Sequence, residues 1–138
     1  MKVIFLDIDG VVNCATTTQR HRGFIGIDPY MAFLVGKLVM ETDAKVVLSS
    51  SWRHSPDGIE EVERQVCKVY DITPSLGFIR GDEIKLWLEE HKGEVDRYAI
   101  IDDNSDMRKG QLPNFFKTQW EVGITPDICE RVKQHLLQ

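Results

Sequence analysis

Three short runs of apolar residues stand out along the chain, and each run ends in polar side chains. The runs are residues 3–6, 45–48 and 98–101. Runs of this length that are rich in Val, Ile, Leu and Phe are typical of strands buried on both faces of a sheet. Aspartate is disfavoured in strands, and a lone buried charge is costly. The acids that follow the first and third runs therefore call for a physical explanation.

Apolar positions at helical spacing lie between and after these predicted strands. The four stripes are Met31, Leu34, Val35, Leu38 and Val39; Ile59, Val62, Val66 and Tyr70; Ile84, Trp87 and Leu88; and Ile128, Val132 and Leu136. Asp28 and Thr125 each precede a proline, as helix-capping residues often do. Residues 115–120 predict a fourth strand, residues 71–78 predict a short strand or a connector, and residues 10–26 and 104–114 predict loops.

Strands that alternate with helices predict an α/β fold. Right-handed crossovers would produce a mostly parallel, Rossmann-like sheet in three layers, with helices on both faces. In such sheets the functional crevice lies at the carboxyl ends of the strands. That rule places the acids and the serines after the three runs along one edge. We find no repeat or linker, and 138 residues suit a single domain, residues 1–138.

Four of these polar residues are carboxylates, Asp7, Asp9, Asp102 and Asp103. Close carboxylates repel one another unless a cation lies between them or one of them takes a proton. Hard oxygen ligands in this number suit Mg²⁺. A magnesium site at a sheet edge is suited to phosphoryl transfer, in which positioning and charge neutralisation supply most of the catalysis. Gly10 would let the chain turn away closely behind the second acid.

Composition limits the class of protein and the kinds of partner that the sequence allows. Hydrophobic residues make up 42% of the chain and charged residues 28%, which is typical of globular proteins. The net charge of -5 provides no basis for gripping long duplex nucleic acid. No stretch approaches the ~20 apolar residues of a membrane span. Cys14, Cys67 and Cys129 form no CxxC pair and predict free thiols in a reducing cytoplasm. Nothing indicates an obligate protein partner.

Four ordered motifs resemble those of haloacid dehalogenase-type phosphohydrolases. The motifs are "FLDIDGVV", "VVLSSSWR", "RGDEIKLWL" and "YAIIDD", and together they extend from the first strand to Asp103. The later segment "FFKTQWEVGIT" resembles the small branch associated with Swiss Army Knife RNA-repair proteins, which is also similar to polynucleotide 3′-phosphatase domains. The resemblance implies a haloacid dehalogenase-like fold with little or no cap domain.

The resemblance also implies roles for the acids. Asp7 would be the nucleophile that forms an aspartyl-phosphate. Asp9 would protonate the leaving oxygen and then deprotonate the attacking water. Mg²⁺ would be bound by the Asp7 carboxylate, by the backbone carbonyl of Asp9 and by one or both of Asp102 and Asp103. Asp106 adds an acid that some variants of the last motif use.

Further roles concern the phosphoryl oxygens. Ser49 would donate a hydrogen bond to one of them, and Ser50 would take its place if the register differs by one residue. Arg80 would neutralise the developing charge, although Lys85, a turn and a half further along, is an alternative cation. Arg53 is expected either to bind a substrate phosphate or to pair with an acid on the surface.

Two groups near the motifs have simpler explanations. Residues 20–22 form a small basic patch, which we expect to be a solvated loop, with a flap over an anionic substrate as the alternative. Trp52 and Trp87 are expected to be packing residues.

The intervals between motifs are too short to fold into a lid, so the site is expected to be open to bulky substrates. We expect a Mg²⁺-dependent phosphatase whose substrate is a nucleotide or a polynucleotide phosphate end. The alternatives are a phospho-acceptor signalling module, a catalytically idle binding domain, or a phosphatase of a small metabolite or a phosphoprotein. A signalling module needs its phosphorylated Asp on a middle strand, whereas here a DxD ends the first strand.

Overall fold

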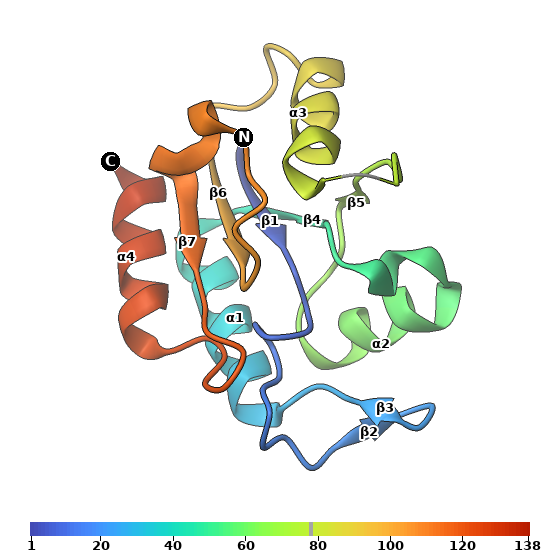
Figure 1. Cartoon of the computed structure of the whole chain (residues 1–138). Coiled ribbons are helices and arrows are strands. Elements are labelled where there is room, and N and C mark those ends of the chain that lie inside the picture. The colour runs from blue at the N-terminus through green and yellow to red at the C-terminus, as the bar shows by residue number, and fades with distance from the viewer. Residues whose placement is uncertain (78) are drawn as a thin grey trace.

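The computed structural model describes residues 1–77 and 79–138, and its centre is a five-stranded parallel sheet (Figure 1). The strand order is β5-β4-β1-β6-β7. The strands are β1 (Lys2–Leu6), β4 (Lys45–Leu48), β5 (Asp71–Ile72), β6 (Arg97–Asp102) and β7 (Phe115–Lys117). The helices are α1 (Pro29–Thr42), α2 (Pro56–Gln65), α3 (Arg80–Glu90) and α4 (Pro126–Leu137). The predicted three-layer α/β fold is confirmed.

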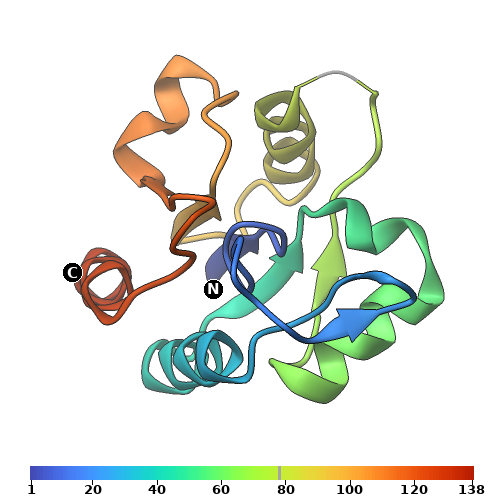
Figure 2. The ribbon, with the colours of Figure 1, turned by 60° about the horizontal axis from the view of Figure 1, so that its bottom comes forward.

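Helices cover both faces of the sheet (Figure 2). The inward side chains of α1, α2 and α4 pack with Ile4 and Leu6 of β1 on one face. On the other face, Val3 and Phe5 pack against α3. All four of these β1 side chains are fully buried, as the apolar run predicts. Burial on both faces makes β1 the centre of the fold and fixes the position where its C-terminal end emerges.

Capping confirms the predicted starts of the first and last helices. The Asp28 side chain accepts hydrogen bonds from the first turn of α1, and the Thr125 hydroxyl accepts one from the first turn of α4. Each cap satisfies a backbone N–H that the helix itself leaves unpaired. The third stripe is also confirmed, because Ile84 and Trp87 of α3 are buried in the core.

Several expected boundaries were wrong. Helix α2 ends at Gln65, and Tyr70 instead donates its backbone N–H to Val46 beside the sheet. Strand β7 ends at Lys117, because residues 119–123 form a turn in which Gly123 N–H donates to the Gln119 carbonyl. Within residues 71–78 a short strand forms, β5, and Phe78 lies outside the described residues.

Two expected loops contain regular structure. Residues 10–26 include an antiparallel hairpin of β2 (Arg20–His21) and β3 (Phe24–Ile25), and residues 104–114 include the 3₁₀ helix η2 (Lys109–Asn114). A second 3₁₀ helix, η1 (Ser51–His54), follows β4. Across residues 1–77 and 79–138 no inserted domain separates the strands, in agreement with the predicted absence of a cap. No helix in the described part of the chain is both long and apolar enough to cross a bilayer.

Candidate active site

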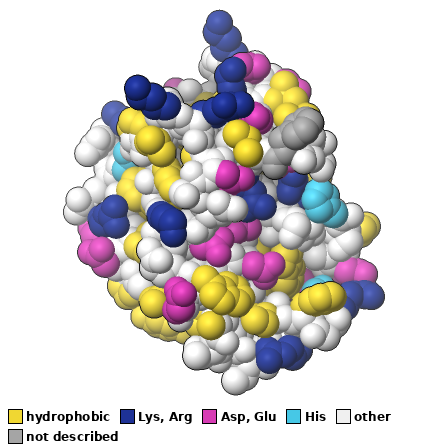
Figure 3. Space-filling view, in the orientation of Figure 1, with side chains coloured by type: hydrophobic (Ala, Val, Ile, Leu, Met, Phe, Trp, Pro, Cys, Tyr) yellow, Lys and Arg dark blue, Asp and Glu magenta, His cyan; other side chains and the backbone are white. Residues whose placement is uncertain are grey.

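Three carboxylates meet at the C-terminal edge of the sheet. Strands β1 and β6 are parallel neighbours, with Leu6 aligned to Ile101, so the residues that follow them lie side by side. Asp7, Asp102 and Asp103 each offer an oxygen within 4.8 Å of the others. Figure 3 shows acidic side chains gathered in the middle of this face of the molecule. The three residues are those predicted to bind a metal through their carboxylates.

Asp7 and Asp102, the two buried acids of this cluster, have raised pKa values, so the state in which both are ionised is disfavoured. Burial and the neighbouring Asp102 carboxylate raise the pKa of Asp7 well above its ordinary value, and Arg80 opposes this effect only in part. Burial likewise raises the pKa of Asp102. A further positive charge at the cluster would therefore stabilise the ionised forms of both acids.

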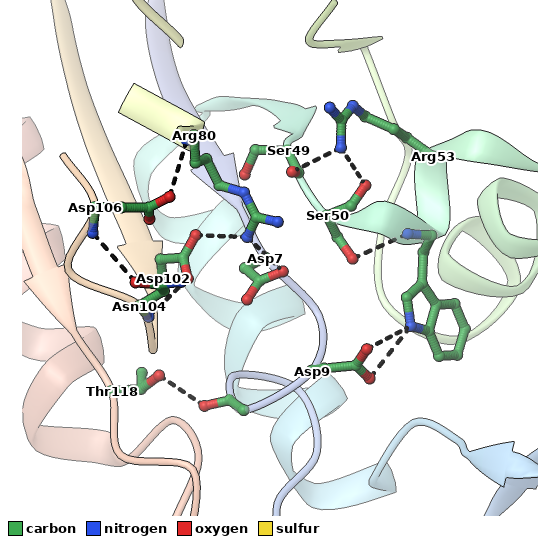
Figure 4. Close-up of polar contacts among 12 residues, drawn as sticks. Asp7, Asp9, Ser49, Ser50, Arg53, Arg80, Asp102, Asn104, Asp106 and Thr118 are labelled. Atoms are coloured by element: carbon green, nitrogen blue, oxygen red, sulfur yellow. Dashed lines mark hydrogen bonds and ion pairs between the residues drawn. The ribbon is translucent and has the colours of Figure 1, made fainter. Parts of the chain in front are cut away.

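Arg80 is the cation that the structure brings to these acids (Figure 4). Its Nη1 lies 3.0 Å from Asp7 Oδ1 and 2.7 Å from Asp102 Oδ2. Burial favours the neutral guanidinium, but the two carboxylates more than compensate and raise the pKa of Arg80. The alternative cation, Lys85, is directed elsewhere: its side chain is 63% exposed, and its Nζ lies 3.6 Å from Glu89.

Asp106 fixes the position of Arg80 by capping α3. Ile79, the residue before α3, provides no side-chain cap. Instead, Asp106 Oδ2 accepts a hydrogen bond from the Arg80 backbone N–H at 3.0 Å, and the Asp106 carbonyl accepts one from Gly81. Asn104 accepts from the Asp106 N–H and donates its own N–H to Asp102. The end of β6 and the segment after it thus carry two acids of the cluster and also orient Arg80.

The structure distinguishes the two candidate serines. Ser49 is fully buried, and its hydroxyl has no hydrogen-bond partner anywhere in residues 1–77 and 79–138. Figure 4 shows this hydroxyl on the side of Arg80 and Asp7. The Ser50 hydroxyl, by contrast, accepts the Trp52 backbone N–H and caps η1. Ser49 is therefore the serine with a hydroxyl free to donate to a bound oxyanion.

Of the two roles expected for Arg53, the structure shows the ion pair with an acid, although this pair is buried and does not lie on the surface. Its side chain is only 4% exposed and forms an ion pair of 3.0 Å with the buried Glu83 of α3. The same guanidinium donates to the backbone carbonyls of Ser49, Ser50 and Thr73. These bonds hold the turn after β4, which presents Ser49, against the start of α3, which presents the site arginine.

Gly10 permits the close approach of the two strand ends. Its φ is +83°, and a Cβ at this position would overlap the Asp103 carboxylate. A side chain is thus excluded on two grounds, conformation and space. The Gly10 carbonyl accepts a hydrogen bond of 2.6 Å from the buried Thr118 hydroxyl beyond β7. Sequence reasoning missed Thr118, because its partner lies 108 residues away.

Asp9 is exposed, and its carboxylate is directed away from those of Asp7 and Asp102 (Figure 4). Trp52 Nε1 donates to its two oxygens at 3.3 and 3.4 Å, and Asn13 Nδ2 donates to Oδ1 at 3.0 Å. Trp52 was predicted only to pack, so its contact with a site acid is a second omission. Asn13 was also missed, although its position four residues after Asp9 in a tight turn was a usable signal.

Comparison with known families agrees with this geometry. The model of one family, described as the HAD domain in Swiss Army Knife RNA repair proteins, matches residues 3–128. HAD stands for haloacid dehalogenase, so the resemblance carried by the four motifs is confirmed. No curated protein and no solved structure matches the chain significantly. The matched range contains every strand end described above.

The capping role of Asp106 predicts a stability effect. Asp106→Ala removes an acceptor from the start of α3, so the free energy of unfolding should fall by about 1 kcal/mol. Asp106→Asn keeps a side-chain oxygen and should lose less. Urea unfolding measures both, with Asp127→Ala as the control, because Asp127 is an exposed acid in the first turn of α4. An Asp106→Ala protein as stable as the wild type would contradict the cap.

The raised pKa values of Asp7 and Asp102 predict a pH effect in metal-free protein. A carboxyl whose pKa is raised on folding contributes stability below its unfolded pKa, near pH 4, and loses that contribution as pH rises through the folded pKa. The stability of Asp102→Asn relative to the wild type should therefore increase as the pH rises above about 4. Asp96→Asn should behave oppositely, because hydrogen bonding to the N-terminal ammonium lowers the pKa of Asp96. Thermal unfolding in EDTA tests both signs, and a flat difference for Asp102→Asn would refute the first.

Proposed function

Because the chain belongs to the family of HAD domains found in Swiss Army Knife RNA repair proteins, we propose that it is a Mg²⁺-dependent phosphatase acting on nucleotide or polynucleotide phosphate ends. Membership of this family indicates a phosphatase of the HAD type. One observation carries the proposal beyond the family: the carboxylates of Asp7, Asp102 and Asp103 converge, and Arg80 contacts two of them.

The donor set fits a magnesium ion. Three carboxylates with oxygens within 4.8 Å of one another provide hard ligands, and the raised pKa values of Asp7 and Asp102 reflect a need for added positive charge. Asp7, Asp102 and Asp103 would hold the ion, together with the Asp9 carbonyl implied by the family motif. When bound, it would neutralise charge on the phosphoryl oxygens and relieve the repulsion between the acids.

The first step makes one bond to phosphorus and breaks another. An Asp7 carboxylate oxygen attacks phosphorus, and the bond from phosphorus to the leaving oxygen breaks with its electron pair. Asp9 gives its proton to that oxygen, so the leaving group departs as a neutral alcohol. Arg80 and the free Ser49 hydroxyl donate hydrogen bonds to the phosphoryl oxygens, where they stabilise the charge of the transition state.

The second step releases phosphate and restores the enzyme. Water attacks phosphorus, and the Asp9 carboxylate takes a proton from it. The bond from phosphorus to Asp7 then breaks, which frees inorganic phosphate and the carboxylate. Asp9 suits both transfers because it is exposed to solvent, while Trp52 and Asn13 hold its orientation.

Two features support a polymer end as the substrate. The described residues contain no inserted domain that would enclose the site, so a large substrate can reach it. The net charge of -5 opposes extended contact with a polyanion, but recognition of a terminus needs few phosphate contacts. The name of the family, which refers to RNA repair, points the same way.

Activity on phosphorylated compounds tests the proposal directly. With Mg²⁺, the wild type should hydrolyse an aryl phosphate and, with higher kcat/KM, oligonucleotides phosphorylated at the 3′ or the 5′ end. EDTA should stop turnover and added Mg²⁺ should restore it, and beryllium fluoride should inhibit as a phosphoryl mimic. Turnover that survives EDTA would refute the metal requirement, and a preference for small sugar phosphates would refute the substrate class.

Variants of the same site should show graded losses of activity. Asp7→Asn should abolish turnover without unfolding the protein, and Asp9→Asn should lower kcat by roughly 10²- to 10⁴-fold. Ser49→Ala should cost about 10²-fold in kcat. Arg80→Ala should cost at least as much, whereas Lys85→Ala should behave like the wild type, because Lys85 pairs with Glu89 away from the acids. Wild-type turnover by Asp7→Asn would show that the nucleophile is misassigned.

A further inference from the structure

A pocket of about 610 Å³ opens directly beside Asp9. Three separate segments supply its aromatic side chains: His21 and Phe24 come from the β2–β3 hairpin, Trp52 from η1, and Trp120 from the turn after β7. Figure 3 shows hydrophobic side chains immediately below the acidic centre of this face. Of these aromatic residues only Trp52 has a part in the phosphoryl chemistry proposed above, through its contact with Asp9.

The surface of this pocket is aromatic. Phe24 is 77% exposed and Trp120 is 39% exposed, so two large aromatic side chains meet solvent at one site. His21 stacks on Trp52, with ring centroids 5.0 Å apart and an interplanar angle of 23°. Exposed aromatic groups gathered around a pocket usually mark a binding site, and flat rings favour flat ligands.

The basic side chains that line the pocket lie against acidic residues of α2. Arg22 forms an ion pair with Asp57, and His21 Nδ1 lies 3.7 Å from Glu61. In the basic patch predicted at residues 20–22, His21 and Arg22 thus lie against acids of α2, and Arg20 donates to the backbone carbonyls of Thr17 and Gln19. A second phosphate has little to gain here, whereas an uncharged planar group can stack on the exposed rings.

Asp9 connects this pocket to the reaction. It lines the pocket, and its carboxylate is held there by the indole N–H of Trp52. Since Asp9 delivers its proton to the leaving oxygen, the leaving group must lie on this side of the phosphorus. The pocket therefore occupies the space where the leaving group extends.

We propose that this pocket binds the nucleobase of the phosphorylated terminal nucleotide, which stacks on Phe24 and Trp120 while its phosphate lies at Asp7. The inference rests on the proposed phosphatase function and adds to it the feature by which a nucleotide is distinguished from other phosphate monoesters. Base–aromatic stacking tolerates any base, so the site would favour nucleotides without reading their sequence.

Three phosphorylated substrates test this assignment. They are an oligonucleotide with a terminal phosphate and an intact last base, the same oligonucleotide with an abasic last sugar, and a phosphotyrosine peptide. In the wild type with Mg²⁺, kcat/KM for the intact end should exceed that for the abasic end by roughly ten-fold or more, mainly through KM. In Phe24→Ala and Trp120→Ala this ratio should fall several-fold toward one. Phe33→Ala removes a ring that is 62% exposed on α1, outside the pocket, and should keep the wild-type ratio.

The outcomes separate the inference from the function on which it rests. A ratio that stays the same in Phe24→Ala and Trp120→Ala, or a preference for the phosphotyrosine peptide, would overturn the base-binding role while leaving the phosphatase intact. Lack of turnover with all three substrates and with an aryl phosphate would overturn both. Fluorescence provides a second readout in Asp7→Asn protein: a mononucleotide should quench tryptophan emission, and inorganic phosphate should not.

Discussion

The main physical constraint on the site is the repulsion among three carboxylates that the fold places close together. Two buried parallel strands, β1 and β6, end side by side, with Asp7 directly after β1, Asp102 at the end of β6 and Asp103 directly after it. Burial raises the pKa of Asp7 and Asp102, and Arg80 offsets only part of the cost. A cluster whose members disfavour their ionised forms lowers stability, but it is well suited to binding a cation, whose charge it complements.

The groups around this cluster are mechanically linked. Asp106 lies four residues after Asp102 and caps α3, the helix that carries Arg80. One connector therefore positions both an acid of the cluster and the arginine that contacts it. On the other side, Arg53 joins the turn that presents Ser49 to Glu83 of the same helix. Helix α3 is thus tied at its first turn to both flanks of the site. A displacement of this helix would therefore move Arg80 and the turn that carries Ser49 together.

The sequence predicted the sheet well and the connectors poorly, and the reason is physical. Strands β1, β4 and β6 lie in continuous apolar runs, which local pattern identifies. The hairpin β2–β3 has two residues in each strand and is held partly by the stacking of His21 on Trp52, which no local pattern encodes. The acids were predicted because motifs place them at strand ends. The cap by Asp106 was not, because its partner is a backbone N–H 26 residues away.

In an open site, one residue can contribute both to catalysis and to substrate recognition. A site without a lid cannot use enclosure to choose its substrate, so selectivity must come from groups that contact the part of the substrate next to the phosphate. Trp52 occupies that boundary: its indole N–H orients Asp9, and its ring supports the wall of the adjacent pocket. In the proposed mechanism, a leaving group that binds against this wall also contacts Asp9, the residue that would protonate it. Binding of the leaving group in this pocket would therefore align it with Asp9. The binding energy would then raise kcat as well as lower KM.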